Sequence, residues 1–191
     1  MDLRNESDKK NPRASASFLE SCIIKTAESN RLSFELLYHE TKNGVYSFAL
    51  SYLRNPADAE DVLQETYIKI WTAAGSYRPR GSPMAWILTI AKNLSLMKLR
   101  ERKSDAGLSA EELIAFYPAE DLPSSDDRLI LESAFSHLTD EERNIVTLHG
   151  VSGLKHREIA ALMSMPVSTV LSKYHRAKKK LRAFIERGDE D

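Results

Sequence analysis

Residues 155–185, KHREIAALMSMPVSTVLSKYHRAKKKLRAFI, set the architecture of the C-terminal part of the chain. Residues 155–163 have the composition of a short helix, and the Ser164-Met165-Pro166 sequence predicts a tight turn. Residues 167–185 then predict a long basic helix. A short helix, a three-residue turn and a long helix in this order are typical of a helix-turn-helix motif.

The long helix should have two different faces. At 100° per residue one face is apolar and contains Val170, Tyr174, Ala177, Leu181 and Phe184. The opposite face carries hydroxyl, ammonium and guanidinium donors, on Thr169, Ser172, Lys173, Arg176, Lys179 and Lys180. Such a face suits the major groove of DNA, with its first residues at base edges and the later cations at phosphates. An ordinary amphipathic helix with a solvated basic face is the alternative.

The sequence before this motif predicts a second small domain and a linker. The stretch Thr139-Asp-Glu-Glu142 predicts a capping box, which would start a helix that ends near His149-Gly150. An earlier helix should carry Leu129, Leu131, Ala134, Phe135 and Leu138. Residues 104–127 contain seven acidic residues, no Lys or Arg and no sustained periodicity, and we expect them to form a flexible acidic linker.

The N-terminal half predicts a helical core of its own. Apolar residues at steps of three and four predict helices over residues 34–52 and 56–74, and again from Met84. Residues 18–28 could form a short helix, whereas residues 1–16 are polar and should be disordered. The fold class is therefore all-α, with two small helical domains at 17–103 and 128–187 joined by the linker.

The 56–74 helix has an acidic face opposite its apolar stripe, made of Asp58, Asp61, Gln64 and Glu65. Phosphates would be repelled by this face, so it cannot be a DNA contact. One interpretation is an ordinary solvated surface, and the other is a docking face for a basic protein partner.

The composition excludes several classes of protein. The 191 residues carry a net charge of −1, and their longest apolar stretches are far shorter than a membrane span. Cys22 is the only cysteine, so no internal disulfide forms and a cytoplasmic location is expected. The sequence contains no phosphate loop, nucleophile elbow or metal-ligand spacing among its five histidines, so we expect no enzyme, cofactor or metal.

Two ordered sets of motifs resemble the extracytoplasmic-function (ECF) sigma factors, the small promoter-recognition subunits of bacterial RNA polymerase. DAEDVLQETYIKIW at 58–71, with AWI at 85–87 and IAKN at 90–93, is similar to the family's region 2. LTDEER at 138–143, with EIA at 158–160, PVSTV at 166–170 and HRAK at 175–178, is similar to region 4.

The resemblance implies three binding surfaces. Asp58, Asp61, Gln64 and Glu65 would bind core polymerase, through the coiled coil of its β′ subunit. The minus-ten promoter element would meet Tyr77, Arg78, Arg80, Ser82, Trp86, Lys92 and Asn93, although the apolar helical spacing of Trp86 also fits a core position. The minus-thirty-five element would meet Thr169, Ser172, Lys173, His175, Arg176, Lys179 and Lys180. The linker would thread the polymerase channel that later carries RNA, unless it is a simple spacer.

The resemblance also implies partners: the β′ and β subunits of core polymerase, promoter DNA and an anti-sigma factor, which could hold the chain at a membrane, but no small-molecule substrate and no membrane insertion. The function would be promoter recognition, melting and transcription initiation, in a stress or envelope response. Four positions depart from frequent family residues, namely Met97, Lys155, Ser168 and Lys173. The alternative function is a free-standing helix-turn-helix regulator that binds operator DNA as a dimer, whereas a nucleic-acid-modifying enzyme lacks a catalytic set.

Overall fold

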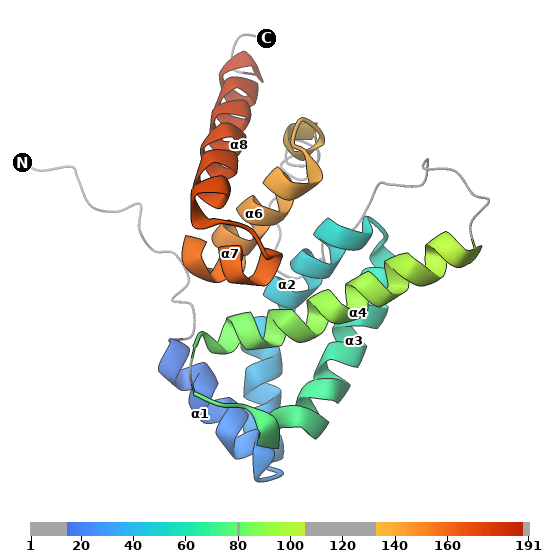
Figure 1. Cartoon of the computed structure of the whole chain (residues 1–191). Coiled ribbons are helices and arrows are strands. Elements are labelled where there is room, and N and C mark those ends of the chain that lie inside the picture. Colours follow the sequence, from blue (N-terminus) through green and yellow to red (C-terminus); the bar gives the residue numbers. More distant parts are fainter. Residues whose placement is uncertain (1–14, 80, 106–132, 189–191) are drawn as a thin grey trace, which may run out of the picture.

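The computed structural model describes residues 15–79, 81–105 and 133–188, and these ranges contain helices and no strand (Figure 1). The first part contains α1 (Ala16–Ala27), α2 (Arg31–Leu53), α3 (Pro56–Ala73), the 3₁₀ turn η1 (Ala74–Ser76) and α4 (Pro83–Asp105). The second contains α6 (Asp140–Gly150), α7 (His156–Met163) and α8 (Val167–Gly188), after a helical turn at 133–136. The predicted all-α fold is confirmed. Residues 1–14 of the predicted tail and 106–127 of the predicted linker lie outside the described residues, whereas Ala16, which was expected to be disordered, begins α1.

Local capping explains where the N-terminal helices begin. The side chains of Ser15, Asn30 and Asn55 accept backbone N–H groups at the starts of α1, α2 and α3, at 3.2, 3.0 and 3.0 Å. Pro56 occupies the first turn of α3, where its missing N–H costs nothing. Arg54 ends α2 with a φ of 50°, which turns the chain sharply into α3.

Helices α1 to α4 pack around a core of fully buried side chains that includes Ile23, Leu37, Ile70 and Ile87. One polar link crosses this core, because the Thr41 and Tyr67 hydroxyls lie 2.6 Å apart. Burial raises the pKa of the Tyr67 phenol, and the hydrogen bond with Thr41 only partly offsets that effect. The possible helix at 18–28 is thus α1, a full member of this bundle.

The C-terminal helices follow the predicted boundaries closely. The Thr139 N–H donates to Glu142 Oε2 at 3.0 Å, and the Glu142 N–H donates to Thr139 Oγ1 at 3.3 Å, which confirms the capping box. The turn between α7 and α8 places Ser164 at a φ of 55°. Lys155 starts α7 with a side chain that cannot accept a hydrogen bond, so the side-chain half of this cap is the Lys155 N–H donating to Glu158 Oε2 at 2.7 Å.

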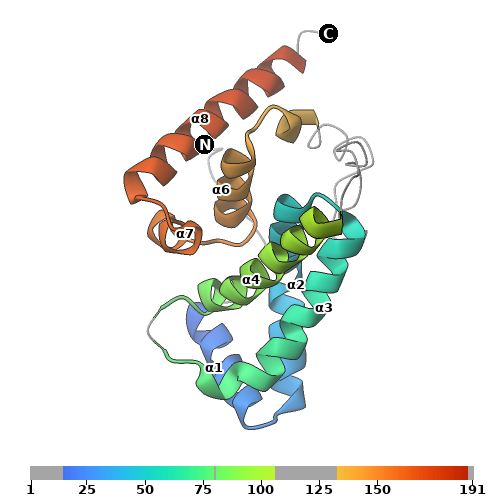
Figure 2. The ribbon, with the colours of Figure 1, turned by 45° about the vertical axis from the view of Figure 1, so that its right-hand side comes forward.

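The two helical units touch each other directly. Helix α6 packs against α2 and α7 packs against α4, while α8 lies on the outer side of the C-terminal unit (Figures 1 and 2). The buried apolar side chains of both units form one cluster, with Phe48 and Leu88 from the first unit and Leu148 and Leu154 from the second. The sequence predicted two units but not this contact.

Candidate functional site

The acidic face of α3 is exposed over most of its length. The Asp61 side chain is 62% exposed and the Glu65 side chain 46% exposed, and Gln64 is also exposed. Asp58 differs, because its side chain is only 20% exposed. The carboxylates therefore divide into an outer set and one inner member.

Two cations of α4 bind Asp58, the least exposed of these carboxylates. Lys98 Nζ lies 3.3 Å from Asp58 Oδ1 and 2.6 Å from Asp61 Oδ2, and Arg102 forms a further ion pair with Asp58. The hydrogen bond with Asp61 raises the pKa of Lys98, against the effect of burial and with help from Asp58. Asp58 and Asp61 thus both join α3 to α4 through Lys98, and Asp61 also lies on the exposed surface with Gln64 and Glu65.

An apolar side chain extends the same face. Ile68 is 64% exposed and follows Gln64 by four residues and Glu65 by three, so the three side chains are neighbours on α3. Sequence reasoning missed Ile68 because it lies outside the apolar stripe. Its place on the acidic face could have indicated a binding role, since an isoleucine among carboxylates does not pack into the core of the bundle.

The predicted minus-ten residues cluster around η1, the following loop and the first turns of α4. Arg78 and Asn93 are exposed, and Ser82 and Trp86 are half-buried. The Ser82 hydroxyl accepts the Ala85 N–H at 3.4 Å, so Ser82 also starts α4. The Arg78 guanidinium donates to the Gly75 and Tyr77 carbonyls, which holds it beside the loop backbone.

Two of the predicted minus-ten residues, Tyr77 and Lys92, have their side chains engaged within the protein, and a third is not described. Tyr77 is 7% exposed and packs edge-on against Trp86 at 5.2 Å between ring centroids, so in this conformation its ring supports Trp86 and cannot stack on a base. The Lys92 ammonium donates to the Leu162 carbonyl of α7 at 2.5 Å. Arg80 lies outside the described residues.

Ion pairs with α6 fix one edge of the α8 polar face. Lys173 pairs with Glu141, and Lys180 Nζ lies 2.7 Å from Glu142 Oε2. Burial of Glu142 opposes its ionisation, but Lys180 and the Thr139 N–H outweigh this effect and lower the pKa of Glu142. Lys173 and Lys180 therefore orient α8 on α6.

The rest of the α8 polar face points outward. Ser172, His175, Arg176 and Lys179 are exposed, and Thr169 is half-buried. Neither Arg176 nor Lys179 has an ion-pair partner among the described residues. This part of α8 can therefore meet phosphates and base edges without first breaking an internal ion pair.

Residues 15–79, 81–105 and 133–188 contain no group of three or more His, Cys, Asp and Glu side chains that could hold a metal ion. None of the helices described there is both long enough and apolar enough to span a bilayer.

Comparison with known families gives two matches in the predicted order. Residues 37–104 match the model of sigma-70 region 2, and residues 128–181 match the model of sigma-70 region 4. A relative, the ECF RNA polymerase sigma factor SigK of Mycobacterium sp. (strain KMS), is 28% identical over 162 residues, which cover 81% of this chain and 84% of the relative. SigK of Mycobacterium tuberculosis (strain ATCC 25177 / H37Ra) is 26% identical over 182 residues, covering 92% and 97%.

Solved structures share the fold. CnrH in complex with the cytosolic domain of CnrY aligns with a TM-score of 0.62 and 22% identity, over 89% of this chain and 98% of that chain. The sigma factor RpoE of Bartonella quintana, in complex with the anti-sigma factor NepR, aligns with a TM-score of 0.65 and 25% identity, over 80% and 96%. With both regions matched in order and ECF relatives along most of its length, this chain is an ECF sigma factor of the sigma-70 family.

Proposed function

We propose that this sigma factor docks on core RNA polymerase through the outer face of α3. The interface would comprise Asp61, Gln64, Glu65 and Ile68, with Asp58 holding α3 against α4 behind it. Exposed carboxylates suit a basic partner surface, and the exposed Ile68 would be desolvated at the centre of that contact. The exposed acidic face of α3 is the observation that supports this proposal, because a free-standing regulator would need no docking face for polymerase.

Promoter DNA would meet two other surfaces. The loop after η1 and the first turns of α4 would hold the unpaired minus-ten strand, with Arg78, Asn93 and the edge of Trp86 as contacts and Tyr77 as the support beneath. Helix α8 would enter the major groove at minus thirty-five through Thr169, Ser172, His175, Arg176 and Lys179, with Lys173 and Lys180 at its α6 edge. The chain itself would catalyse no reaction, since RNA synthesis belongs to the polymerase.

The partner of the RpoE relative suggests a further partner. An anti-sigma factor that covered the α3 face or the minus-ten surface would keep this chain from polymerase. A chain that binds core polymerase would also be located in the bacterial cytoplasm, where the polymerase is. Adding such a partner to the transcription assay below should abolish the chain's effect.

The decisive experiment is transcription from genomic promoter fragments by purified core polymerase, with and without this chain. We expect specific transcripts only when the chain is present. The variant Asp61→Lys/Glu65→Lys should lose them, whereas the matched double reversal Glu35→Lys/Glu40→Lys, also at exposed positions, should keep them. Equal transcription by the Asp61/Glu65 variant and the wild type would contradict the docking face.

A further inference from the structure

Two exposed aliphatic side chains interrupt the polar side of α8. Leu171 is 48% exposed and Val167 is 39% exposed, and the two lie one helical turn apart. The helix packs on its own unit through Val170 and Ala177, which are fully buried. Sequence reasoning missed Leu171, because apolar spacing predicts no core position for it and its side chain offers no hydrogen-bond donor to DNA.

The position of Leu171 places it among residues that are proposed to meet DNA. Ser168 precedes it by three residues and His175 follows it by four, so both are its neighbours on the helix surface, and both are exposed. At 100° per residue, Leu171 lies about 40° around the helix from His175 and about 100° from the buried Val170. Leu171 therefore lies on the solvent side of α8, beside its proposed DNA-binding residues.

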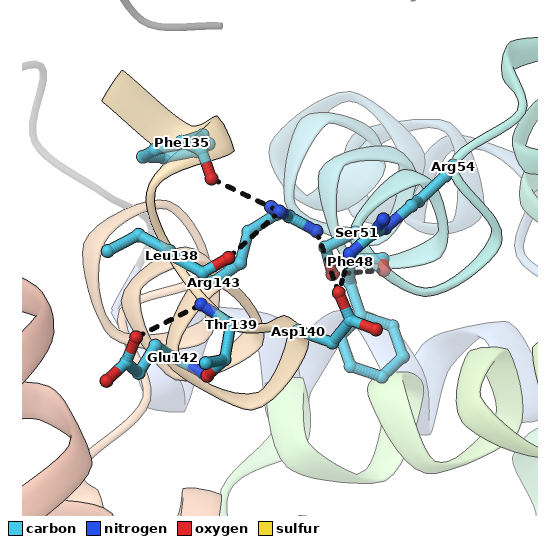
Figure 3. Close-up of polar contacts among 9 residues, drawn as sticks. All are labelled: Phe48, Ser51, Arg54, Phe135, Leu138, Thr139, Asp140, Glu142 and Arg143. Carbon is cyan, nitrogen blue, oxygen red and sulfur yellow. Dashed lines mark hydrogen bonds and ion pairs between the residues drawn. The ribbon is translucent and has the colours of Figure 1, made fainter. Parts of the chain in front are cut away.

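Ion pairs on the opposite side of α8 fix which side is free. Lys173 pairs with Glu141 and Lys180 pairs with Glu142. The two lysines lie roughly 160–180° around the helix from Leu171. The Thr139 N–H holds the Glu142 carboxylate at the start of α6, as Figure 3 shows. Rotation of α8 that buried Leu171 would break both ion pairs, so Leu171 stays on the free side.

The charge of α8 indicates what kind of surface would cover Leu171. Residues 167–188 contain seven Lys or Arg and one acidic residue, Glu186. Such a helix favours a polyanionic partner. Duplex DNA is a polyanion that also presents an apolar group in its major groove, the C5-methyl group of thymine. An exposed leucine among cations and hydroxyls thus matches a major groove that contains thymine.

We propose that Leu171 is a specificity-determining residue that contacts the C5-methyl group of a thymine in the minus-thirty-five element, with Val167 extending the apolar contact. The proposal rests on the proposed function, because it requires α8 to enter the major groove of a promoter. A leucine side chain neither donates nor accepts a hydrogen bond, so its selectivity comes from removing the methyl group from water. Cytosine and uracil lack this methyl group, and both should be disfavoured at that position.

The test compares thymine with deoxyuridine in one duplex, since the two bases differ only in the C5-methyl group. The probe is a duplex that the full chain with core polymerase selects from a pool randomised over the minus-thirty-five element. Each thymine of that element is then replaced singly by deoxyuridine, and the affinity of the polymerase complex is measured at one salt concentration. At one position the replacement should weaken binding by the wild type about three- to tenfold, the scale of one buried methyl group.

Variants assign this discrimination to a residue. Leu171→Ala removes no buried side chain, so the fold should persist, and the variant should bind the thymine and deoxyuridine duplexes equally. The matched control is Ile185→Ala, an aliphatic position near the other end of α8 that is 58% exposed, and it should discriminate as the wild type does.

The possible outcomes separate the inference from the function beneath it. Equal binding of thymine and deoxyuridine duplexes by the wild type would overturn the methyl contact, and full discrimination by Leu171→Ala would overturn the role of Leu171. Weaker binding of Leu171→Ala to core polymerase, with discrimination unchanged, would assign the side chain to a protein contact instead. A wild-type polymerase complex that selected no sequence from the pool would contradict the proposed function itself.

Discussion

Asp58 and Asp61 lie three residues apart on α3, yet their surroundings give them different tasks. Asp58 is largely buried and is bound by Lys98 and Arg102, so its charge is used within the fold. Asp61 is mostly exposed and shares only Lys98. The sequence predicted both as docking residues, because helical spacing shows which residues share a face but not which cation of a later helix will cover one of them.

This difference predicts that substitution of Asp58 mainly lowers stability, whereas substitution of Asp61 mainly weakens binding to core polymerase. Asp58→Ala should lower the free energy of unfolding by about 1–3 kcal/mol, since it leaves Arg102 without this carboxylate and Lys98 with Asp61 alone. Asp61→Lys with Glu65→Lys should change stability little, because exposed pairs contribute about 0–1 kcal/mol, but should weaken core binding by a few kcal/mol. Denaturant unfolding and a core polymerase titration of each variant would distinguish the two effects; equal unfolding of Asp58→Ala and the wild type would contradict the inner role.

The α7 helix has an unusually weak start for the first helix of a DNA-binding motif. Lys155 occupies the position where a serine, threonine, asparagine or aspartate side chain would accept a backbone N–H. Lys155→Ser should therefore stabilise the protein by about 1 kcal/mol, seen as a higher midpoint in denaturant. The matched change Lys178→Ser, at an exposed position within α8, should give no such gain, because serine there lowers helix propensity.

Packing between α6, α7 and α8 brings together a pair of half-buried histidines, His149 and His156. The His149 and His156 rings stack with centroids 4.5 Å apart, and Tyr174 of α8 meets both edge-on. The His149 Nδ1–H donates to the Leu154 carbonyl at 2.9 Å, whereas the buried His156 Nε2 has no hydrogen-bond partner among the described residues. Burial, and to a smaller extent the nearby His149, lower the pKa of His156.

The folded state disfavours protonated His156. The unfolded chain therefore binds more protons than the folded chain once the pH falls below about 6.5, the ordinary pKa of histidine. Stability should therefore be complete above that pH and decline as the pH falls towards the lower pKa of the folded state. Thermal unfolding between pH 7.5 and 5 would show this decline, and His156→Gln should flatten it. The exposed His175→Gln should leave the slope as in the wild type; an unchanged slope in His156→Gln would contradict this account.

On α8 the exposed cations should differ in what they do. Arg176→Ala should lower promoter affinity of the polymerase complex by about 1–3 kcal/mol if the guanidinium reads a base. Lys179→Ala should weaken binding to all sequences similarly and reduce the slope of log affinity against log salt by about one. Binding titrations over several salt concentrations measure both, and slopes unchanged in both variants would contradict the placement of this face on DNA.

The elements show where sequence reasoning works and where it stops. Boundaries of α3, α7 and α8 follow from apolar spacing, caps and Pro56 or Pro166, all of which are local. Burial of Tyr77 under Trp86 was not predictable, because an aromatic residue in a loop rich in Gly, Pro and Arg has the same local pattern whether it faces solvent or core. The contact of Gly44 with Ser152 depends on residues more than a hundred positions apart, and no local period encodes it.

For the whole chain, the contact between the units bears on how promoter specificity arises. Each unit would offer one small DNA-binding surface, and the Lys92 ammonium donates to the Leu162 carbonyl of the other unit. One helix in one groove makes few base contacts and gives weak binding. On the proposed function, specific binding would require that both surfaces act together at the spacing of a promoter.

This leads to the prediction that separates the sigma factor from a free-standing regulator. The intact chain alone should bind promoter duplex poorly, because its two surfaces are held together and the minus-ten surface grips only unpaired bases. Core polymerase fixes both units at promoter spacing, so the second contact becomes intramolecular and overall affinity should rise by about 10²–10⁴. The measurement is a titration of labelled promoter duplex with the full chain, with and without core polymerase at one stated salt concentration, and with a scrambled duplex as control. Nanomolar, sequence-specific binding by a polymerase-free dimer would favour the regulator, since a dimer supplies two recognition helices without help and would not need the α3 face.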